Sequence, residues 1–464
     1  MKINNIEITG LASDSRKVKP GFAFFAINGR DENGEQYIDA ARAAGATVIV
    51  TGEEYEGDSF KVPNVRLFLA ECAWQFYQPV VPNLIGVTGT AGKTSVVHFC
   101  RYILENLGKD VASLGTLGLI RNGEAIDVCG NGQNVPEPII LASTLHDLYK
   151  QGCEYVAMEA SSQGLMQERV GAVPIKVAGF TNLTPEHIGP REHADFAEYK
   201  AAKQILFNRL LVDGGVSVLN ADDEHYPDFI TPNKKIMTYG KNGADIKLMS
   251  IEATPEFQKV TIAVHGQIYQ YKILAAGDYQ VWNSMCAIGM VMGLKFDISD
   301  IVRAIENAPS PEGRIELVGI TPKGGSVYID HSHTGKQIET TLKSMRPTCK
   351  GRLIVMIAPS GGRPHRGEGL GKAANKFADV VYVTDDCPRF DEPNALRETI
   401  REFCPNMINA GGRKEAILRA VADLENGDVL LIANKGREPY VEIQGVRHPW
   451  SDFDTTKEAI GKLK

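Results

Sequence analysis

The residues with the clearest chemical signature form the run Thr88–Ser95, which reads TGTAGKTS. An apolar segment precedes it at 83–87, and a helical pattern follows at 96–104. This order predicts a strand, a glycine loop and a helix, in which backbone N–H groups bind phosphate. Lys93 would neutralise the β- and γ-phosphates, and the Thr94 hydroxyl would bind Mg²⁺. The predicted ATP-binding loop is Gly89, Thr90, Ala91, Gly92, Lys93, Thr94 and Ser95. The alternative is a glycine turn followed by a solvated lysine.

The loop differs in spacing from the general pattern G-x-x-x-x-G-K-[ST], because position 87 is Val rather than Gly. The shorter pattern T-G-T-x-G-K-[TS] indicates a narrower group of enzymes. A nucleotide loop also needs a metal with oxygen ligands. Glu159 ends one predicted strand and His187 follows another, so both lie at carboxyl ends, where parallel sheets hold ligands. Each alone would more often be structural, but together they predict a magnesium site.

Apolar strand-like runs alternate with helical patterns over most of the chain, as in α/β folds with parallel sheets. Predicted strands cover 46–50, 84–88, 155–159, 177–181, 215–219, 327–330, 353–358, 380–384 and 429–433. Predicted helices cover 37–44, 194–211 and 282–292. Alternating apolar and polar residues over 245–274 predict antiparallel strands that extend the sheet at one edge.

The length of 464 residues suggests about three domains. Pro79, Pro82 and the run Ala308–Arg314 predict the boundaries. We predict an α/β protein with a small N-terminal α/β domain (1–82), a central P-loop domain with a doubly wound, mostly parallel sheet (83–308), and a Rossmann-like C-terminal α/β domain (309–464).

Composition narrows the class of protein. The net charge of −7 argues against nucleic acid as the main partner. No apolar stretch follows the N-terminus or is long enough to span a bilayer, so we expect neither a signal peptide nor membrane insertion. The eight cysteines form no C-x-x-C pair, which is typical of reduced thiols. We expect a monomeric cytoplasmic enzyme.

Further segments carry a resemblance to a known family. They are Asp14–Ala26, Ser161–Arg169, Ala201–Phe207 and Asp385–Arg389. Together with the loop, and in this order, they resemble the Mur ligases, ATP-dependent enzymes that extend the peptide of peptidoglycan precursors. The chain is most similar to the MurE type, which adds the third residue to UDP-N-acetylmuramoyl-L-alanyl-D-glutamate.

The resemblance implies roles for individual residues. The UDP-muramoyl peptide would contact Ser13, Ser15, Arg30, Asp31, Glu32, Asn134, Val135, Ser161, Gln167 and Arg169. Lys203 would be carbamylated and would join Thr94, Glu159 and His187 around magnesium. Asn283, Arg314 and Asp330 would bind ATP between the second and third domains. Without the family, the segment around Ser13 is a turn that caps a small sheet, and Lys203 is a solvated helix lysine.

The third domain would select the amino acid. Asp385–Arg389 resembles the D-N-P-R motif of enzymes that add meso-diaminopimelate. The residues implied here are Arg363, Asp386, Cys387, Pro388, Arg389, Asn434 and Glu438. Arg389 would bind the carboxylate at the far end of diaminopimelate, a group that lysine lacks.

The chain departs from the family pattern mainly around this pocket. Cys387 replaces the motif asparagine, and Asn434–Glu438 reads NKGRE where the family has GKGHE. Arg363 lacks its usual G-D-R-D context, two extra residues follow His187, and Asn134–Pro136 replaces T-T-P. These changes bear mainly on which amino acid is added.

The expected activity is ATP-dependent ligation of meso-diaminopimelate to the UDP-muramoyl dipeptide through an acyl phosphate. ATP and Mg²⁺ would be required, and the substrates would be small molecules. One alternative is a related ligase that adds another amino acid, such as L-lysine, or D-alanyl-D-alanine. The others are a folylpolyglutamate synthetase relative and a non-catalytic paralogue that binds UDP-muramoyl peptides. The uridine-like segment argues against folate, and intact Lys93, Glu159, His187 and Lys203 argue against a non-catalytic protein.

Overall fold

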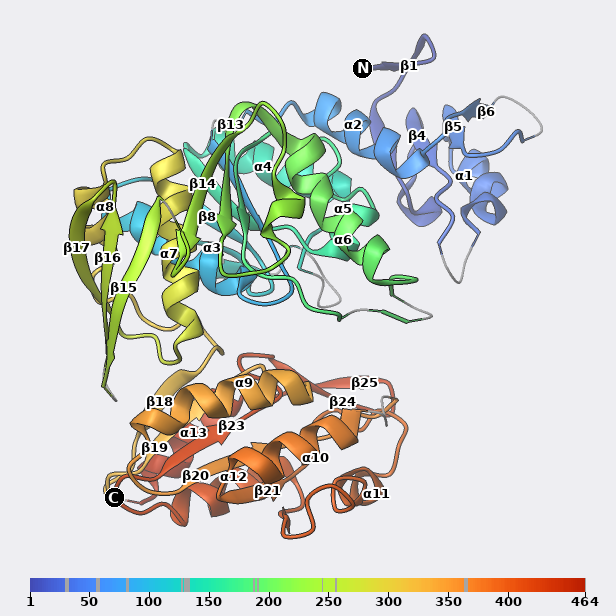
Figure 1. The fold of residues 1–464 in the computed structure, drawn as a ribbon. Helices are drawn as coiled ribbons and strands as arrows, with labels where there is room; N and C mark the ends of the chain where they lie inside the picture. Colours follow the sequence, from blue (N-terminus) through green and yellow to red (C-terminus); the bar gives the residue numbers. More distant parts are fainter. Residues whose placement is uncertain are drawn as a thin grey trace. The chain divides into compact units, whose positions relative to one another are not determined.

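The computed structural model describes residues 1–29, 33–55, 59–80, 83–126, 128, 134–186, 188–189, 192–243, 245–254, 257–362 and 366–463. The chain forms two compact units, which we describe separately (Figure 1). The first comprises Met1–Leu248, Ala263–Gln267 and Asn283–Ala304, and the second comprises Met249–Ile262, Ile268–Trp282 and Ile305–Lys464.

The first unit begins with a small parallel sheet in the order β3-β4-β5-β6. Its elements are β3 (Gly10–Ala12), β4 (Phe22–Phe25), α1 (Ile38–Ala43), β5 (Val48–Thr51), β6 (Ser59–Lys61) and α2 (Val65–Tyr77), preceded by the antiparallel pair β1 (Lys2–Ile3) and β2 (Ile6–Glu7). Successive side chains of a strand point to opposite faces. Phe25 and Val50 accordingly lie in one core cluster, and Phe24 and Ile49 lie in another. The predicted strand and helix of this region are confirmed, with ends shifted by one or two residues.

The central sheet of the first unit has a parallel core in the order β8-β11-β7-β12-β13-β14. These strands are β7 (Asn83–Thr88), β8 (Val111–Gly115), β11 (Tyr155–Glu159), β12 (Ile175–Phe180), β13 (Leu211–Asn220) and β14 (Lys235–Gly240). The strands β9 (Gly118–Arg121) and β10 (Glu124–Ile126) extend β8 as antiparallel neighbours. The register pairs Glu159 with Val87 and Phe180 with Thr88. Three strands therefore end side by side at the glycine loop.

Helices connect these strands. They are α3 (Lys93–Asn106), α4 (Pro138–Lys150), α5 (Ser162–Met166), α6 (Phe196–Ile205), α7 (Tyr279–Gly293) and α8 (Ile298–Ile305). The predicted helix 194–211 is wrong at both ends. The Asp195 side chain caps the N-terminus of α6 by accepting from the Glu198 N–H. The turns after α6 are π-helical over Leu206–Leu210, and Leu211 already pairs with Ile175 in the sheet.

Three long strands occupy the stretch for which we predicted an antiparallel edge. They are β15 (Ile246–Ala253), β16 (Gln258–Val264) and β17 (Gln267–Ile273), in consecutive order. Buried and half-buried residues alternate along β16, as the sequence pattern requires. The pairing of β15 with β14 is parallel, so the antiparallel expectation is wrong at that position.

The second unit contains a six-stranded sheet in the order β18-β19-β23-β20-β21-β22, antiparallel only between β18 and β19. Its strands are β18 (Glu316–Ile320), β19 (Ser326–Ile329), β20 (Leu353–Ile357), β21 (Val380–Val383), β22 (Ile408–Asn409) and β23 (Val429–Ile432), followed by the hairpin β24 (Tyr440–Ile443) and β25 (Val446–Pro449). Its helices are α9 (Gly335–Met345), α10 (Arg366–Phe377), α11 (Pro393–Glu398), α12 (Arg413–Ala422) and α13 (Asp452–Gly461). Separate core clusters contain α9 with α10 and α12 with α13, so helices cover both faces of the sheet. The predicted α/β fold class is confirmed.

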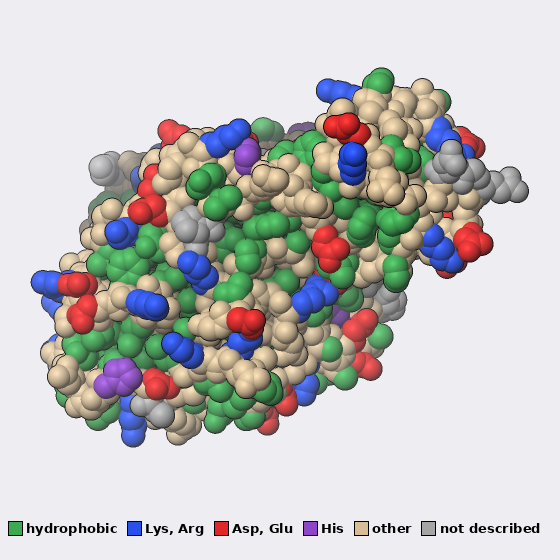
Figure 2. Space-filling view, turned by 90° about the horizontal axis from the view of Figure 1, so that it is seen from above, with side chains coloured by type: hydrophobic (Ala, Val, Ile, Leu, Met, Phe, Trp, Pro, Cys, Tyr) green, Lys and Arg blue, Asp and Glu red, His purple; other side chains and the backbone are tan. Residues whose placement is uncertain are grey.

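Within the described ranges, no helix has the length and apolar character needed to cross a membrane. Figure 2 shows that cationic and anionic side chains are interspersed over the face drawn there.

Candidate active site

The glycine loop joins β7 to α3, and two of its residues must be glycine. Gly89 has φ of 150° and Gly92 has φ of 89°. A Cβ atom on Gly89 would lie 1.9 Å from Thr181 Oγ1, and one on Gly92 would lie 2.4 Å from Asn283 Oδ1. The loop can therefore pack this closely only without side chains at these positions. The loop leads directly into the N-terminus of α3, a geometry that fits a phosphate chain.

The loop is held by groups that follow β12. Asn182 Oδ1 accepts a hydrogen bond from the Ala91 N–H at 2.9 Å, and its Nδ2 donates to the Ala91 carbonyl at 3.1 Å. Thr181 Oγ1 donates to the same carbonyl at 2.6 Å. Lys93 Nζ donates to the carbonyl oxygens of Gly89 at 2.8 Å and Thr90 at 3.0 Å. The lysine therefore lies over its own loop.

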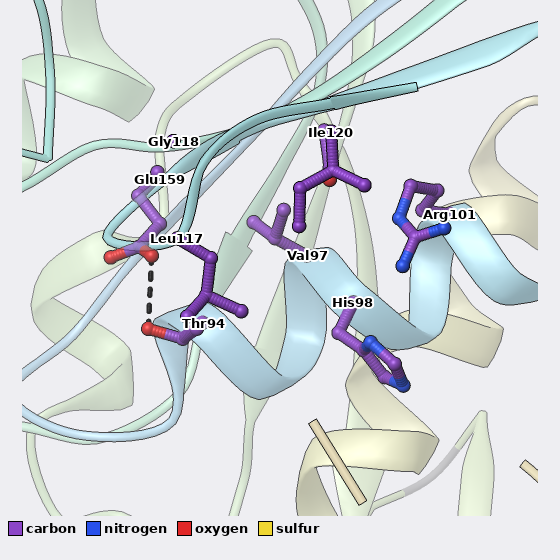
Figure 3. A pocket seen from close by; sticks show the side chains of 10 residues that line it. Thr94, Val97, His98, Arg101, Leu117, Gly118, Ile120 and Glu159 are labelled. Atoms are coloured by element: carbon purple, nitrogen blue, oxygen red, sulfur yellow. Dashed lines mark hydrogen bonds between the residues drawn. The ribbon is translucent and has the colours of Figure 1, made fainter. Parts of the chain in front are cut away.

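Thr94 and Glu159 are buried and in direct contact, as Figure 3 shows. Thr94 Oγ1 donates to Glu159 Oε1 at 2.9 Å. The same carboxylate accepts from the Thr116 N–H at 2.8 Å and from Thr116 Oγ1 at 3.2 Å. A small pocket beside this pair is lined by Val97, His98, Arg101, Ser113, Gly115, Leu117, Gly118 and Ile120. Hydroxyl and carboxylate oxygens are the ligand atoms that Mg²⁺ prefers, so Thr94 and Glu159 fit the predicted magnesium site.

Lys203 is buried rather than solvated. Its side chain is 1% exposed, and Nζ donates to the Gly89 carbonyl at 2.8 Å. The ammonium also lies 4.4 Å from the ring centroid of Tyr199. Burial, reinforced by the charge of Lys93 and opposed by Glu186, holds the pKa of Lys203 well below its usual value. This environment shifts Lys203 toward the uncharged amine, which is the form that can react with CO₂. The fourth predicted ligand, His187, lies outside the described residues.

Residues expected to contact the muramoyl peptide gather around Arg169. Its guanidinium donates to the Val135 carbonyl at 3.0 Å and to Gln167 Oε1 at 2.6 Å. Ser161 instead caps α5, because its hydroxyl accepts from the Gly164 N–H at 3.2 Å. Asn134, adjacent to Val135, is half-buried. Ser13 and Ser15 flank Asp14 in a separate turn, and Arg30, Asp31 and Glu32 lie outside the described residues.

In the second unit, Asp330 lies beside the turn that carries Arg314. Its Oδ2 accepts from the Ile315 N–H at 2.7 Å, and its Oδ1 accepts from the Ser332 N–H at 2.8 Å. Ile315 has φ of 41°, which is strained for a β-branched residue. Asp330 therefore stabilises an unfavourable backbone conformation next to Arg314. Asn283 belongs to the first unit, where it packs against Gly92.

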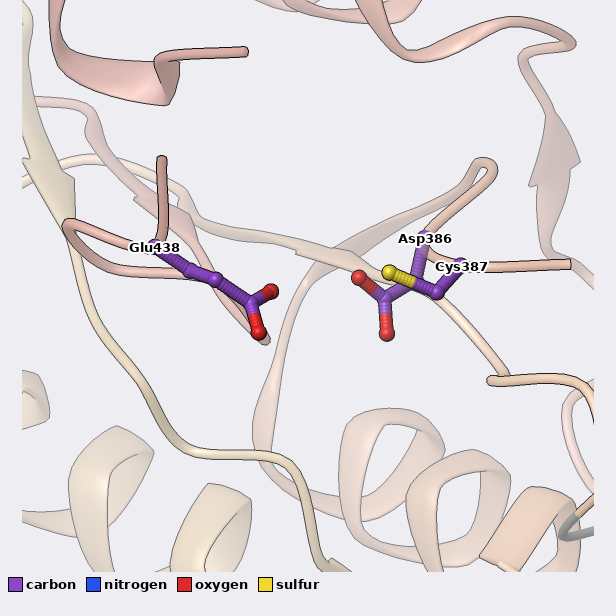
Figure 4. Close-up of side chains that lie close together, drawn as sticks. All are labelled: Asp386, Cys387 and Glu438. Atoms are coloured by element: carbon purple, nitrogen blue, oxygen red, sulfur yellow. The ribbon is translucent and has the colours of Figure 1, made fainter. Parts of the chain in front are cut away.

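The predicted amino-acid residues include a compact buried group. Ligand atoms of Asp386, Cys387 and Glu438 lie within 4.8 Å of one another, and their side chains converge in Figure 4. Lys435 Nζ donates to all three, at 3.0 Å to Asp386 Oδ1, 3.5 Å to Cys387 Sγ and 2.5 Å to Glu438 Oε2. Burial raises the pKa of the Cys387 thiol, so the sulfur remains protonated at neutral pH. This group has the ligand types of a metal site, but an ammonium already lies among them.

Arg389 and Asn434 have unusual backbone angles close to this group. Arg389 has φ of 53°, and its Nε lies 3.8 Å from Glu442 Oε2. Asn434 has φ of 84°, in the left-handed region that glycine occupies easily. Its Oδ1 accepts from the Ala358 N–H at 2.8 Å, and its Nδ2 donates to the Ala358 carbonyl at 2.7 Å. Asn434 therefore joins the ends of β20 and β23 through one donor and one acceptor of its amide. Pro388 is buried beside Cys387, and Arg363 lies outside the described residues.

Comparison with known proteins decides the family. The chain matches the Mur ligase family catalytic domain over residues 7–77, the Mur ligase middle domain over 87–291 and the Mur ligase glutamate ligase domain over 313–436. It is also 36% identical, over 98% of its own length and 95% of the relative's, to a protein of Caulobacter vibrioides named UDP-N-acetylmuramoyl-L-alanyl-D-glutamate--2,6-diaminopimelate ligase. The chain belongs to the Mur ligase family.

Further relatives of this Mur ligase carry the same name. The protein of Agrobacterium fabrum is 35% identical over all of this chain and 95% of its own length. A solved structure of a ligase with that name has 27% identity and a TM-score of 0.73, and covers 98% of this chain and 95% of its own. The ligase MurF of Thermotoga maritima in complex with ADP has a TM-score of 0.63 at 18% identity, with 99% of each chain covered. That likeness shows the fold alone.

Several residues at this Mur ligase site were not predicted. They are Thr116, Thr181, Asn182, Tyr199, Ser360 and Lys435. Asn182 had a signal, since it follows a predicted strand next to the loop in the same way as His187. Lys435 also had a signal, because it is the lysine of the segment that resembles the family's GKGHE pattern, but only the fold establishes that its three partners lie close together.

Proposed function

We propose that this Mur ligase joins meso-2,6-diaminopimelate to the D-glutamyl carboxylate of UDP-N-acetylmuramoyl-L-alanyl-D-glutamate and converts ATP to ADP and phosphate. The observation that carries the proposal is the 36% identity, over nearly the whole chain, to a ligase named for this reaction. The contact between Thr94 and Glu159 beside a glycine loop supports it. The reaction would supply peptidoglycan precursors in the cytoplasm, and the enzyme would act as a monomer.

The chemistry requires activation of a carboxylate, because a carboxylate is a poor electrophile at neutral pH. The D-glutamyl oxygen attacks the γ-phosphorus of ATP, ADP leaves, and an acyl phosphate forms. The amine of diaminopimelate then attacks the acyl carbon, and phosphate leaves from the tetrahedral intermediate. Phosphoryl transfer depends mainly on positioning and charge neutralisation.

The side chains of this protein would provide both the positioning and the charge neutralisation. The loop N–H groups would bind the phosphates, and Lys93 would turn from the Gly89 carbonyl toward the β- and γ-oxygens. Arg314 would neutralise negative charge on the nucleotide, and Asp330 would hold its turn. Thr94, Glu159, His187 and carbamylated Lys203 would hold Mg²⁺, which supplies positive charge to the transferring phosphate.

The amino acid would bind in the C-terminal domain. Arg389 would contact the distal carboxylate of diaminopimelate through two parallel hydrogen bonds. The carboxylates of Asp386 and Glu438 would contact its ammonium group. Arg169 and its partners would hold the muramoyl peptide, and Ser13, Ser15 and Arg30–Glu32 would hold the UDP group.

Phosphate release by the purified protein tests the proposal. With ATP, Mg²⁺ and the UDP-muramoyl dipeptide, we expect release to depend on meso-diaminopimelate and to be at least about 100-fold slower with L-lysine, which lacks the distal carboxylate. Preference for L-lysine or D-alanyl-D-alanine would overturn the substrate assignment. No turnover with any amine, but retained binding of the UDP-muramoyl dipeptide, would favour the non-catalytic paralogue.

A further inference from the structure

The group formed by Asp386, Cys387 and Glu438 brings two carboxylates together in a largely buried place. Such an arrangement is unfavourable without a compensating positive charge. Asp386 and Cys387 are buried, and the Glu438 side chain is 28% exposed. Two carboxylates this close repel each other unless a cation lies between them. Lys435 is that cation, and its side chain is 0% exposed.

The Lys435 ammonium has no donor left for a ligand. An ammonium carries three N–H bonds, and Lys435 Nζ has three acceptors, namely Asp386 Oδ1, Cys387 Sγ and Glu438 Oε2. Lys435 can therefore influence a bound amino acid only through these partners. With the thiol neutral, the group keeps one net negative charge, which suits an incoming ammonium ion.

The charges of the group are mutually stabilised. Burial would raise the pKa of Asp386, but Lys435, Arg413 and the Ser360 hydroxyl outweigh it and lower that pKa. Burial would lower the pKa of Lys435, but Asp386 and Glu438 outweigh it and raise that pKa. Asp386 and Lys435 therefore both remain charged at neutral pH.

The backbone of Lys435 also connects the group to the nucleotide-binding turn of the same unit. Its carbonyl oxygen accepts from the Glu438 N–H at 3.0 Å and lies 3.1 Å from His331 Nδ1. His331 follows Asp330, and its N–H donates to the Gly313 carbonyl at 3.0 Å. Lys435 thus contacts the amino-acid group directly and is connected through His331 to the turn that carries Arg314.

We propose that Lys435 is a positioning residue of the amino-acid site, a built-in cation that holds Asp386 and Glu438 where they bind the ammonium group of the incoming amino acid. This inference rests on the proposed function. It also explains why the group has the ligand types of a metal site without needing a metal.

The kinetic test uses Lys435→Ala, with Lys414→Ala as a matched control at a half-exposed lysine. Lys435→Ala should raise KM for diaminopimelate about 10- to 100-fold, because unpaired carboxylates move apart. KM for ATP should change less than about threefold. n-Propylammonium, which replaces the deleted atoms, should restore much of the lost affinity. An unchanged KM for diaminopimelate, or no rescue, would overturn the proposal.

A binding test does not depend on the reaction. Removal of the built-in cation should leave a cavity lined by a thiol and two carboxylates, which Cd²⁺ can occupy. Lys435→Ala should show a thiolate–cadmium absorption band that is missing in wild type and in Lys435→Ala/Cys387→Ala. Absence of the band would count against the built-in cation. If wild type were inactive with every amine, the proposed function would fail while this titration still decided the role of Lys435.

A second variant covers the case in which Lys435→Ala does not fold. Lys435→Met keeps most of the side-chain volume but lacks the charge. It should show the same rise in KM for diaminopimelate, and n-propylammonium should have no effect because no space is available. A KM equal to that of wild type in folded Lys435→Met would overturn the proposal.

Discussion

Arg389 combines a strained backbone with a guanidinium that is only weakly paired within the protein. Among the described residues, its Nε is a buried atom without a hydrogen-bond partner, 3.8 Å from the nearest Glu442 oxygen. A distal carboxylate could satisfy this donor. Arg389→Ala should lower kcat/KM for diaminopimelate about 100- to 1000-fold and leave KM for ATP nearly unchanged. Steady-state kinetics measure both.

Arg389→Lys is the informative control for this prediction. It keeps the positive charge but loses the planar fork, so we expect only partial recovery. Both variants should retain the positive φ of 53° seen at Arg389, and unfolding in urea will show whether their stabilities match. Wild-type activity in Arg389→Ala would mean that the amino-acid pocket lies elsewhere.

The lowered pKa of Lys203 predicts that the stability of the folded protein depends on pH. Its pKa is lowered by burial and by Lys93, so the unfolded chain binds more protons than the folded one at pH values between that lowered pKa and the ordinary lysine pKa. Lys203 therefore lowers stability near pH 7, and this effect fades as pH approaches the ordinary lysine pKa of about 10.4. Lys203→Met should be more stable by about 1 kcal/mol or more at pH 7.

Urea unfolding in bicarbonate-free buffer tests this prediction, because a carbamate would change the charge of the residue. The advantage of Lys203→Met should shrink between about pH 8 and pH 10. Lys200→Met, at a neighbouring position on α6 with its side chain 29% exposed, serves as the control. A stability difference that stays constant with pH would contradict the expected titration of Lys203.

At the scale of elements, the end of β8 sets the position of Glu159. A Cβ atom on Gly115 would lie 2.3 Å from Glu159 Oε1, so Gly115→Ala must displace the carboxylate from Thr94. The added atom would also lie 2.7 Å from Glu159 Cγ and Cδ, and Glu159 is buried, so stability should fall by about 1 to 3 kcal/mol. Turnover should fall about 10- to 100-fold.

The control is Gly461→Ala near the end of α13, where nothing lies within 4 Å of the added atom. It should leave turnover unchanged. The phosphate-release assay compares the two variants at saturating substrates. Full activity in Gly115→Ala would show that the contact between Thr94 and Glu159 is not needed for catalysis.

The positions of the strands along the chain could be predicted, because buried parallel strands are continuous apolar runs. The strand Tyr155–Glu159 matches its prediction residue for residue. The end of α6 was not predictable, because pairing of Leu211 with Ile175 decides it and these residues are far apart in sequence. Local patterns predict which elements exist, whereas tertiary pairing determines their ends.

The same limit applies to the site. The glycine loop is local, so its sequence predicts it. The Asn182–Ala91 bonds, the Thr116–Glu159 bonds and the Lys435 group join segments that are distant along the chain. The contact of the Asn434 amide with Ala358, which joins two strand ends, likewise depends on the fold.

At the scale of the whole molecule, buried acidic groups predict sensitivity to acid. Asp386 and Asp428 both have lowered pKa values, because Lys435 and Arg352 outweigh the effect of burial. A depressed pKa stabilises the fold above the unfolded value of about 4, and this contribution is lost as pH falls. The urea midpoint should therefore drop between about pH 5 and pH 3.

Asp428→Asn provides the comparison. It should be less stable than wild type at pH 7, because Arg352 loses its charged partner, and its stability should depend less on pH in the acid range. Asp39→Asn changes an exposed residue and should unfold like wild type at pH 7. Equal pH profiles for Asp428→Asn and wild type would contradict the prediction.

The thiol of Cys387 gives this site a feature that an inhibitor chemist could use. Its raised pKa makes it a slow nucleophile toward general alkylating reagents in solution. A diaminopimelate analogue with an electrophile next to its ammonium would instead be held beside the sulfur, where proximity compensates for low reactivity. Such a covalent compound would spare ligases that have asparagine at this position, because an amide cannot be alkylated in this way.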